Sequence, residues 1–237
     1  MTFPRRVEPE LLDALSPADP LAEKARRDLR LVNALMGHAA IWKRILKKAA
    51  LPHTPSAIVD LGAGDGTFML RLSRVGAWPG AKLYLVDRQP AVAGSTLGQF
   101  AESGLHAEVV EAEVNDWLDD TSPVDMILAN LFLHHFSDAP LKELLRRIAQ
   151  KTQVFAACEP RRSKVALAGS HLLGLIGCGP VTRYDAVVSV RAGFTDSEIS
   201  ALWPDKHNWR LEEYSTGLFS HGFFARRLPT LGSKHRT

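Results

Sequence analysis

Residues 58 to 68 read Ile-Val-Asp-Leu-Gly-Ala-Gly-Asp-Gly-Thr-Phe, and this stretch decides the fold class. An apolar run ends in Asp60, three glycines follow at alternate positions, and residues 67–75 continue as an amphipathic segment. This order predicts a strand, a tight turn and a helix. Because glycine carries no Cβ, such a turn lets the backbone bend sharply and come close to a bound molecule.

The charge of this turn discriminates between two classes of ligand. A dinucleotide fingerprint reads G-x-G-x-x-G, whereas here the third glycine, Gly66, comes one position early. Asp60 and Asp65 would repel a pyrophosphate, and no G-K-[ST] sequence is present, which excludes a P-loop. A ligand with an amino group and no phosphate fits the acidic turn, and S-adenosylmethionine (SAM) is such a ligand.

A further acidic residue ends the next predicted strand. Residues 82–86 are strand-like and lead into Asp87. In a parallel sheet this carboxylate would lie beside the glycine turn, because ligands bind at the carboxyl ends of the strands. It could accept hydrogen bonds from both ribose hydroxyls, each worth roughly 1.5–3 kcal/mol. NAD would use an acid in the same place, so the glycine turn, and not Asp87, favours SAM.

Four segments in order resemble the successive motifs of class I SAM-dependent methyltransferases, and the resemblance covers about residues 54 to 160. It implies an α/β, Rossmann-like fold with a seven-stranded, mostly parallel sheet and helices on both faces. It also implies SAM as the cofactor and S-adenosylhomocysteine as the product. The four segments are Val59–Gly66, Leu85–Asp87, Glu111–Leu118 and Val124–Phe136.

The same resemblance implies a set of cofactor-binding residues. Glu113 is expected to accept a hydrogen bond from the adenine amino group, with the backbone N–H of Val114 on the ring. Asp116 competes with Glu113 for this role, or caps a turn over residues 115–120. Asn130 is expected to offer its backbone carbonyl to the amino group of the ligand. The predicted set is Asp60, Gly62, Ala63, Gly64, Gly66, Asp87, Arg88, Glu113, Val114, Asp116 and Asn130.

The residues after Asn130 bear on the methyl acceptor. Many methyltransferases that act on exocyclic nitrogens carry Asn/Asp-Pro-Pro-Tyr here, whereas this chain has Asn130-Leu-Phe-Leu. The difference argues against methylation of a base nitrogen and favours an oxygen or carbon acceptor. His134 and His135 follow, and a histidine can take the proton of a phenol. The alternative is that one histidine packs or holds the loop.

The segment Arg183–Phe194 carries charges at both ends of an apolar strip. Together with Asn33–Gly37 it resembles a subgroup of bacterial small-molecule methyltransferases, some of them associated with polyketide and phenolic-lipid pathways. This resemblance suggests that Arg183 or Asp185 orients the acceptor. An ion pair of Asp185 with Arg183 or Arg191 that fixes the loop is an equal alternative.

Two more features are assigned to the acceptor side. The apolar helix predicted over Val165–Ile176 is expected to line the acceptor pocket. Glu159, at the end of the fifth predicted strand, is a candidate at the rim of the pocket. Its alternative role is to neutralise Arg161 or Arg162.

Three parts of the chain are predicted: an N-terminal helical extension (1–52) that covers the cofactor site, the methyltransferase domain (53–227) and a basic tail (228–237). Alternating strands and helices predict a parallel sheet with right-handed crossovers. A final antiparallel hairpin completes it. Strands are expected near 56–60, 82–86, 107–112, 125–129, 153–158, 209–214 and 218–226, with helices near 66–75, 91–103, 138–150 and 162–176 and another from Thr195.

Composition narrows the class of protein. The 237 residues are 46% hydrophobic and 23% charged with a net charge of +3, which is typical of a globular domain. Cys158 and Cys178 have no metal-binding spacing, so no metal is expected. The N-terminus lacks the apolar core of a signal peptide, and the apolar run 165–178 is shorter than the ~20 residues of a spanning helix. These features predict a cytoplasmic protein without a membrane partner.

The sequence therefore predicts a SAM-dependent methyltransferase that acts on a hydroxyl of a small, partly apolar, phenolic or polyketide-like acceptor, as a monomer or homodimer. One alternative is an RNA methyltransferase, because basic residues cluster in the N-terminal helices. Nucleic acid is disfavoured because aromatic residues suited to base stacking do not accompany them. The other alternative is a catalytically silent SAM-binding protein.

Overall fold

A computed structural model describes residues 3–49, 51, 53–76 and 78–229. The predicted basic tail falls largely on residues 230–237, which lie outside the described residues. The strands of the structure are β1 (Ala57–Leu61), β2 (Lys82–Asp87), β3 (His106–Glu111), β4 (Val124–Asn130), β5 (Thr152–Pro160), β6 (Trp209–Thr216) and β7 (Ser220–Arg227).

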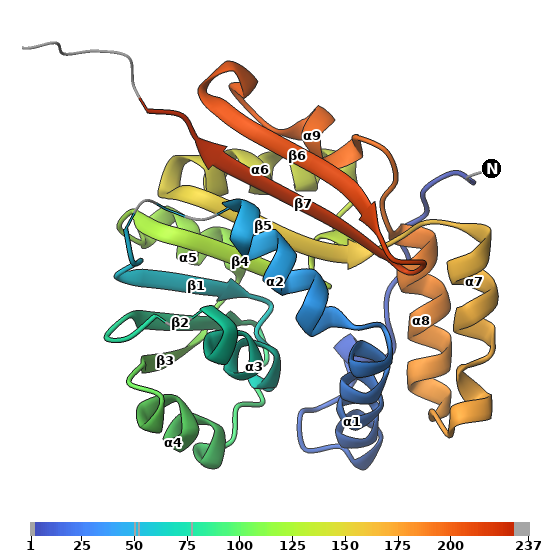
Figure 1. Ribbon diagram of the computed structural model, residues 1–237. Helices are drawn as coiled ribbons and strands as arrows, with labels where there is room; N and C mark the ends of the chain where they lie inside the picture. The colour runs from blue at the N-terminus through green and yellow to red at the C-terminus, as the bar shows by residue number, and fades with distance from the viewer. Residues whose placement is uncertain (1–2, 50, 52, 77, 230–237) are drawn as a thin grey trace, which may run out of the picture.

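These strands form one sheet in the order β3-β2-β1-β4-β5-β7-β6, with helices on both faces (Figure 1). Strands β1 to β5 pair in parallel, whereas β7 runs antiparallel to β5 and to β6. The prediction of a seven-stranded, mostly parallel sheet that ends in an antiparallel hairpin is confirmed.

The helices and the short 3-10 turns (η) alternate with these strands. Their bounds are α1 (Pro20–Leu35), α2 (His38–Ala49), α3 (Thr67–Gly76), α4 (Gly94–Glu102), α5 (Val114–Asp120), α6 (Asp138–Lys151), α7 (Lys164–His171), α8 (Pro180–Ala192), α9 (Glu198–Leu202), η1 (Leu12–Ala14), η2 (Leu133–His135), η3 (Leu173–Ile176) and η4 (Lys206–Asn208).

The centre of the sheet is apolar on both faces. In β5 the side chains of Phe155 and Ala157 join one buried cluster, while Val154, Ala156 and Cys158 join the cluster on the other face. Helices cover both faces of a parallel sheet, which is why its central strands are near-continuous apolar runs. Burial also raises the pKa of the Cys158 thiol, as expected for a cysteine that only packs.

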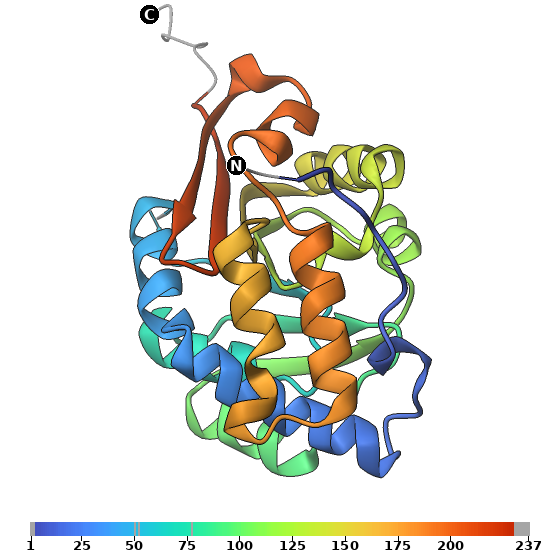
Figure 2. The same cartoon turned by 90° about the vertical axis from the view of Figure 1, so that its right-hand side faces the viewer.

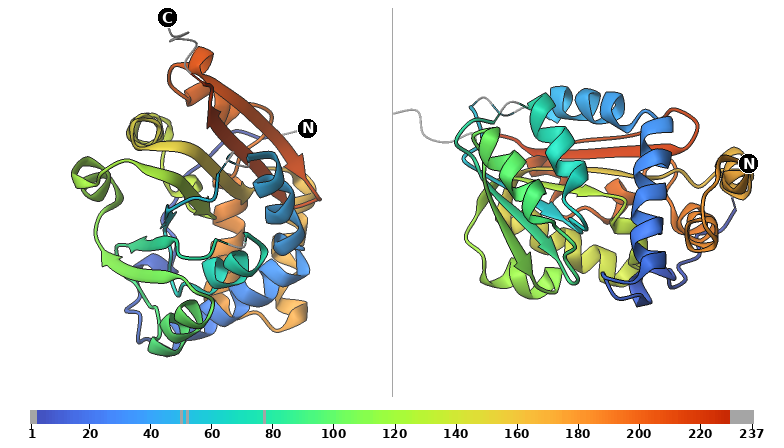
Figure 3. Two further views of the ribbon diagram at one scale, coloured as in Figure 1. Left: turned by 60° about the vertical axis from the view of Figure 1, so that its left-hand side comes forward. Right: turned by 90° about the horizontal axis from the view of Figure 1, so that it is seen from below.

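Two N-terminal elements frame one end of the sheet. Helix α1 begins where the Asp19 carboxylate accepts the backbone N–H of Leu21 at 2.7 Å, with Pro20 in the first helical position. Seen from below, α1 lies between the α7–α8 pair and helices α3 and α4 (Figure 3). The N-terminal extension therefore packs across the edge where β1 and β4 end.

Residues 3–19, the N-terminal strap, run beside α8 (Figure 2). The backbone N–H of Arg6 donates to the carbonyl of Arg191 at 3.1 Å. Further along, the Asp185 carboxylate accepts the N–H groups of Leu11 and Leu12 at 2.7 and 3.0 Å. The strap is thus tied to α8 near its C-terminal end, at Arg191, and near its middle, at Asp185.

Helix α8 was not assigned by the sequence pattern, which treats Arg183–Phe194 as part of a loop region. The helix begins at Pro180 after Gly179, and it buries Val181, Asp185 and Val188 among others. Because α8 packs against α1, α7 and η2, its buried positions do not form one stripe. Its valines are also poor helix formers, so neither periodicity nor propensity reveals the helix.

Two smaller expectations are also corrected. Residues 115–120 belong to α5, and Asp116 lies in its first turn instead of capping an isolated turn. The ion pair of Asp185 with Arg183 or Arg191 does not occur among the described residues, because the Asp185 carboxylate binds the strap instead.

The structure also gives the start of helix α9 and the lengths of the helices. The predicted helix start at Thr195 falls at Glu198, whose side chain accepts the N–H of Thr195 at 3.0 Å in the turn before the helix. Over the described part of the chain, every helix is too short or too polar to cross a membrane.

Candidate active site

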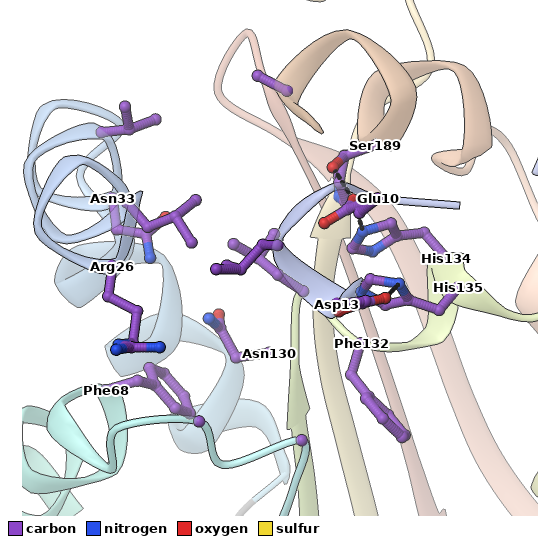
Figure 4. A pocket seen from close by; sticks show the side chains of 18 of the residues that line it. Glu10, Asp13, Arg26, Asn33, Phe68, Asn130, Phe132, His134, His135 and Ser189 are labelled. Carbon is purple, nitrogen blue, oxygen red and sulfur yellow. Dashed lines mark hydrogen bonds and ion pairs between the residues drawn. The ribbon is translucent and has the colours of Figure 1, made fainter. Parts of the chain in front are cut away.

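A cavity of about 880 Å³ opens at the carboxyl ends of the parallel strands. It lies beside the ends of β1 and β4, where the strand order reverses, which is where ligands bind in open α/β sheets. Its other walls come from α1, the N-terminal strap, the α7–η3 segment and α8. Figure 4 shows the side chains that converge on it.

The glycine turn forms the floor of one half of the cavity. Gly62 and Gly64 have φ of +73° and +55°, a left-handed conformation that favours glycine. A Cβ on Gly62 would meet the Phe132 ring at 2.4 Å, whereas the same position on Gly64 faces open space. The Gly64 backbone therefore borders the cavity without a side chain in the way.

Asp87 is held beside this turn by two backbone groups. Its Oδ2 accepts the N–H of Gly64 at 2.8 Å, and its Oδ1 accepts the N–H of Gln89 at 2.7 Å. A carboxylate has about four lone-pair sites, so each oxygen can accept one more hydrogen bond. Asp87 thus faces the cavity oriented for a ligand with two neighbouring hydroxyls.

Asp60 lies beneath the turn and not on the cavity wall. Its side chain is 1% exposed. Burial, and then the charge of Asp87, raise its pKa well above the ordinary value. Its Oδ2 accepts no hydrogen bond from the described residues. The sequence predicted Asp60 at the ligand, and the structure places it one layer below.

Of the predicted adenine-binding residues, Glu113 and Val114 line the cavity. Arg88 also lines it, and its Nε lies 3.9 Å from Oε1 of Glu113. Asp116, the competing candidate, lies in the first turn of α5 and is not part of the cavity wall. The placement therefore favours Glu113 over Asp116. The other predicted residues on the wall are Gly62, Ala63, Gly64, Asp87 and Asn130, whereas Gly66 does not line the cavity.

Helix α1 contributes residues that sequence reasoning missed. Nη1 of Arg30 lies 2.5 Å from Oδ2 of Asp65, which fastens α1 to the glycine turn. Arg26 and Asn33, also on α1, line the cavity (Figure 4). The available signal was their spacing of four and three residues, which places all three polar side chains on one helix face.

The other half of the cavity contains a histidine between two carboxylates. His134 is 3% exposed. Its Nδ1 lies 2.8 Å from Oε2 of Glu159, and its Nε2 lies 3.2 Å from Oε1 of Glu10. Burial alone would lower its pKa, but hydrogen bonds to Glu10 and Glu159 and their charges outweigh burial and raise it to about 9. His134 is therefore an imidazolium at neutral pH.

Glu159 organises the loop after β4. Leu131 adopts φ of +55°, a conformation that costs a non-glycine residue roughly 1–3 kcal/mol. Just beyond it, the Glu159 carboxylate accepts the N–H groups of Phe132 and Leu133 at 3.0 and 2.9 Å. Glu159 is therefore wholly buried and holds η2, instead of lying at the rim.

The alternative role of Glu159 is also wrong, because both arginines have other partners. Arg162 pairs with Glu198. Nη1 of Arg161 donates to the Gly217 carbonyl at 3.3 Å. The charge of Glu159 is instead compensated by the His134 imidazolium.

His135 has a different environment from His134. Its Nδ1 lies 3.3 Å from Oδ2 of Asp13, and its side chain is 27% exposed at the cavity wall. Its ring lies against that of His134, with 4.3 Å between the centroids. Within the described part of the chain, no hydrogen bond reaches its Nε2. The strap thus supplies an acidic partner to each histidine, Glu10 to His134 and Asp13 to His135 (Figure 4).

Glu10, His134 and His135 each offer a potential metal ligand, and these atoms lie within 4.8 Å of one another. The sequence predicted no metal because it shows no metal-binding spacing, and Glu10 stands 124 residues before His134. In this arrangement both ring nitrogens of His134 are already engaged by carboxylates. The protons on these two nitrogens therefore occupy the positions at which His134 would bind a metal.

Arg183 and Asp185, the other predicted catalytic residues, do not line this cavity. Arg183 lines a separate hollow of about 320 Å³ with His171 and Tyr184. Asp185 is buried under the strap, where burial raises its pKa to about 6 against the N–H donation of Leu11. The structure therefore brings His134 and His135 to the cavity, but neither Arg183 nor Asp185.

Comparison with known proteins agrees with this geometry. Residues 58–153 match the model of a family described as a methyltransferase domain. No curated protein matches the chain in sequence.

Several solved structures share the fold. The plantazolicin methyltransferase BpumL in complex with SAH (S-adenosylhomocysteine) matches with a TM-score of 0.65 and 12% identity, over 89% of this chain and 92% of that one. An O-methyltransferase family protein from Burkholderia thailandensis has a TM-score of 0.61 and 15% identity, over 89% and 61% of the two chains. The mitomycin 7-O-methyltransferase MmcR has a TM-score of 0.54 and 20% identity, over 92% of this chain and 60% of that one.

Such low identities show the fold alone, and the family match supplies the activity. Residues 58–153 therefore form a class I SAM-dependent methyltransferase domain, and its cofactor is SAM.

Proposed function

We propose that the protein transfers the methyl group of SAM to a hydroxyl of a small, largely apolar acceptor. The observation that carries this proposal is the composition of the cavity beyond the cofactor half. Apart from the two histidines and their acidic partners, that half is walled mainly by apolar side chains, among them Leu29, Val32, Met36, Phe136, Leu173, Ile176, Val190 and Phe219.

The strand ends and α1 hold the cofactor in this proposal. Asp87 accepts from the ribose hydroxyls, and Glu113 with the N–H of Val114 binds the adenine. Asn130 offers its backbone carbonyl to the amino group. Arg26, a cation that lines the same cavity, pairs with the carboxylate of the methionine part. When bound, SAM supplies a methyl group that is activated by its sulfonium.

The two histidines have separate roles. Both ring nitrogens of His134 already carry a proton, one donated to Glu159 and the other to Glu10, so His134 cannot accept another. His135 donates from Nδ1 to Asp13, which leaves Nε2 free to take the proton of the acceptor hydroxyl. His134 acts as a positioning residue, because its contacts with Glu10 and Glu159 hold the strap and η2 against each other.

The described N-terminal extension acts as a cover. The strap and α1 close the cavity on the side away from the sheet, and the Arg30–Asp65 pair links α1 to the glycine turn. A closed, apolar site aligns acceptor and cofactor and keeps water from competing, and alignment alone can contribute several kcal/mol.

The names of two solved structures add support. The Burkholderia thailandensis protein is called an O-methyltransferase family protein, and MmcR is called a mitomycin 7-O-methyltransferase. These names describe those proteins, and they make a hydroxyl the first acceptor to test here.

The basic N-terminal helices speak less for RNA than the sequence suggested. Lys24, Arg30 and Lys48 each form an ion pair with a carboxylate of the same chain, namely Asp28, Asp65 and Glu212. Paired charges contribute little to phosphate binding, so a small-molecule acceptor is the better proposal.

Transfer of a labelled methyl group from SAM to a panel of phenols, amines and RNA tests the proposal. We expect phenolic acceptors to be methylated, with the product methyl at the NMR shift of a methoxy group. Methylation of amines or RNA alone would overturn the hydroxyl assignment. Calorimetric binding of SAM and SAH without transfer to any acceptor would indicate a silent binding protein.

A further inference from the structure

The α7–η3–α8 corner exposes an apolar group of side chains at the mouth of the cavity. Leu175 is 83% exposed, and Leu172 and Ile176 beside it are 57% and 44% exposed. Isolated exposed leucines are common, but a contiguous exposed apolar patch marks a contact surface.

Helix α1 extends this patch. Nζ of Lys24 donates to the Gly177 carbonyl at 3.1 Å, and the Asp28 carboxylate accepts the N–H of Gly179, so α1 lies against the turn after η3. Leu31 and Leu35 follow Asp28 by three and seven residues, on the same helix face, and they are 44% and 66% exposed. Both views in Figures 1 and 2 place α1 beside the α7–α8 connection. The apolar rim is defined as Leu31, Leu35, Leu172, Leu175 and Ile176.

This rim is continuous with the inside of the cavity. Leu35, Leu172 and Ile176 line the cavity and are also exposed at the surface. An apolar path therefore leads from the protein surface to the half of the cavity that contains His135.

The charged residues on the α7–η3–α8 side of the rim are all positive. Residues 161–184 contain no Asp or Glu, but they include Lys164, Arg183 and His171. Arg183 packs beside Gly174 of η3, and Tyr184 next to it is 45% exposed. Asp28 of α1, which contacts the start of α8, is 8% exposed and engaged by Lys24 and Gly179. The rim thus combines leucines, an isoleucine, a tyrosine and nearby cations.

We propose that the apolar rim docks on an anionic lipid bilayer surface. Leucines at a polar-basic border insert at the boundary between headgroups and acyl chains, while arginines contact anionic headgroups and tyrosine lies at headgroup level. The contact is peripheral, which differs from the membrane span that the helices are too short or too polar to form. An apolar acceptor dissolved in the bilayer would enter the cavity along the rim, and only this last statement rests on the proposed function.

Vesicle co-sedimentation of the full chain tests the proposal. The probes are vesicles of phosphatidylcholine alone and vesicles that also contain phosphatidylglycerol. We expect binding to the anionic vesicles at least tenfold tighter than to the neutral ones, and weaker binding as salt is raised from 0.1 to 0.5 M. Equal or absent binding to both kinds of vesicle would overturn the proposal.

Two variants locate the contact. Leu175→Asp places a charge at the most exposed rim position, so binding to anionic vesicles should fall at least tenfold. Leu228→Asp is the matched control, because Leu228 is 42% exposed at the far end of β7 and should bind as the wild type does. Equal losses in both variants would contradict a contact at the rim.

Two further measurements separate this proposal from its rivals. If Leu175→Asp dissociates a dimer in sedimentation velocity without vesicles, the rim is the contact between two copies and the lipid proposal fails. SAM binding by calorimetry should be the same in wild type and Leu175→Asp. If the wild-type protein does not bind SAM, the proposed function fails, whereas the vesicle result still tests the lipid contact independently.

Discussion

The His134 cluster allows a prediction with a magnitude. The pKa of His134 is raised from 6.5 to about 9. This difference corresponds to roughly 3 kcal/mol, at about 1.4 kcal/mol per pKa unit. The lowered pKa of Glu10, about 2, describes the same contact from the other side and is not added. Because the folded-state pKa of His134 is above the unfolded value, this stabilisation is fully present below pH 6.5 and is lost as pH rises through about 9.

The perturbation is Glu10→Gln, which removes one of the two carboxylates but keeps the size of the side chain. We expect the pKa of His134 to fall by about one unit, because Glu159 remains at 2.8 Å while burial still disfavours the charge. The free energy of unfolding at neutral pH should fall by about 1 kcal/mol or more. Its decline between pH 6.5 and 9 should also become shallower.

Two measurements check this prediction. NMR titration of ¹⁵N-histidine gives the pKa of His134 directly, and urea unfolding at pH 6, 7.5 and 9 gives the stability. Glu8→Gln is the matched control, because Glu8 lies on the same strap and pairs with Arg6 instead of a histidine. A wild-type pKa at or below 6.5, or an unchanged pKa in Glu10→Gln, would refute the reasoning. His134 would then be free to act as a base, and the assignment of that role to His135 would lose its basis.

Three further predictions concern the cofactor and the base. Asp87→Ala should weaken SAM binding at least tenfold in calorimetry, since it loses two bonds of roughly 1.5–3 kcal/mol each, while Asp116→Ala should bind normally; equal effects would contradict the placement of the ribose. Arg26→Ala should weaken the binding of SAH at least tenfold but leave the binding of 5′-methylthioadenosine, which has no carboxylate, unchanged. Equal losses for both ligands would mean that Arg26 only supports the fold. His135→Ala should lower turnover by about 10²–10⁴-fold without changing the affinity for SAM. Asp13→Asn should cause a smaller loss of turnover. Full activity of His135→Ala between pH 6 and 9 would rule out the histidine mechanism.

Local signals in the sequence determined the sheet and the cofactor half of the cavity. The apolar run before Asp60, the left-handed glycines and the acid at Asp87 are neighbours along the chain or one βαβ unit apart. Their placement follows from strand-turn-helix geometry and from the rule that ligands bind at the ends of parallel strands. The strand bounds and the final hairpin could be predicted for the same reason.

The acceptor half was decided only by the tertiary structure. Glu10 meets His134 across 124 residues, and Asp185 meets Leu11 across 174, so no spacing pattern signals either contact. Helix α8, which anchors the strap, is buried on several sides and therefore lacks the amphipathic period that reveals a surface helix. Because the charge state of a buried histidine depends on which carboxylates the fold brings against it, sequence could name both histidines, and only the fold could give them different roles.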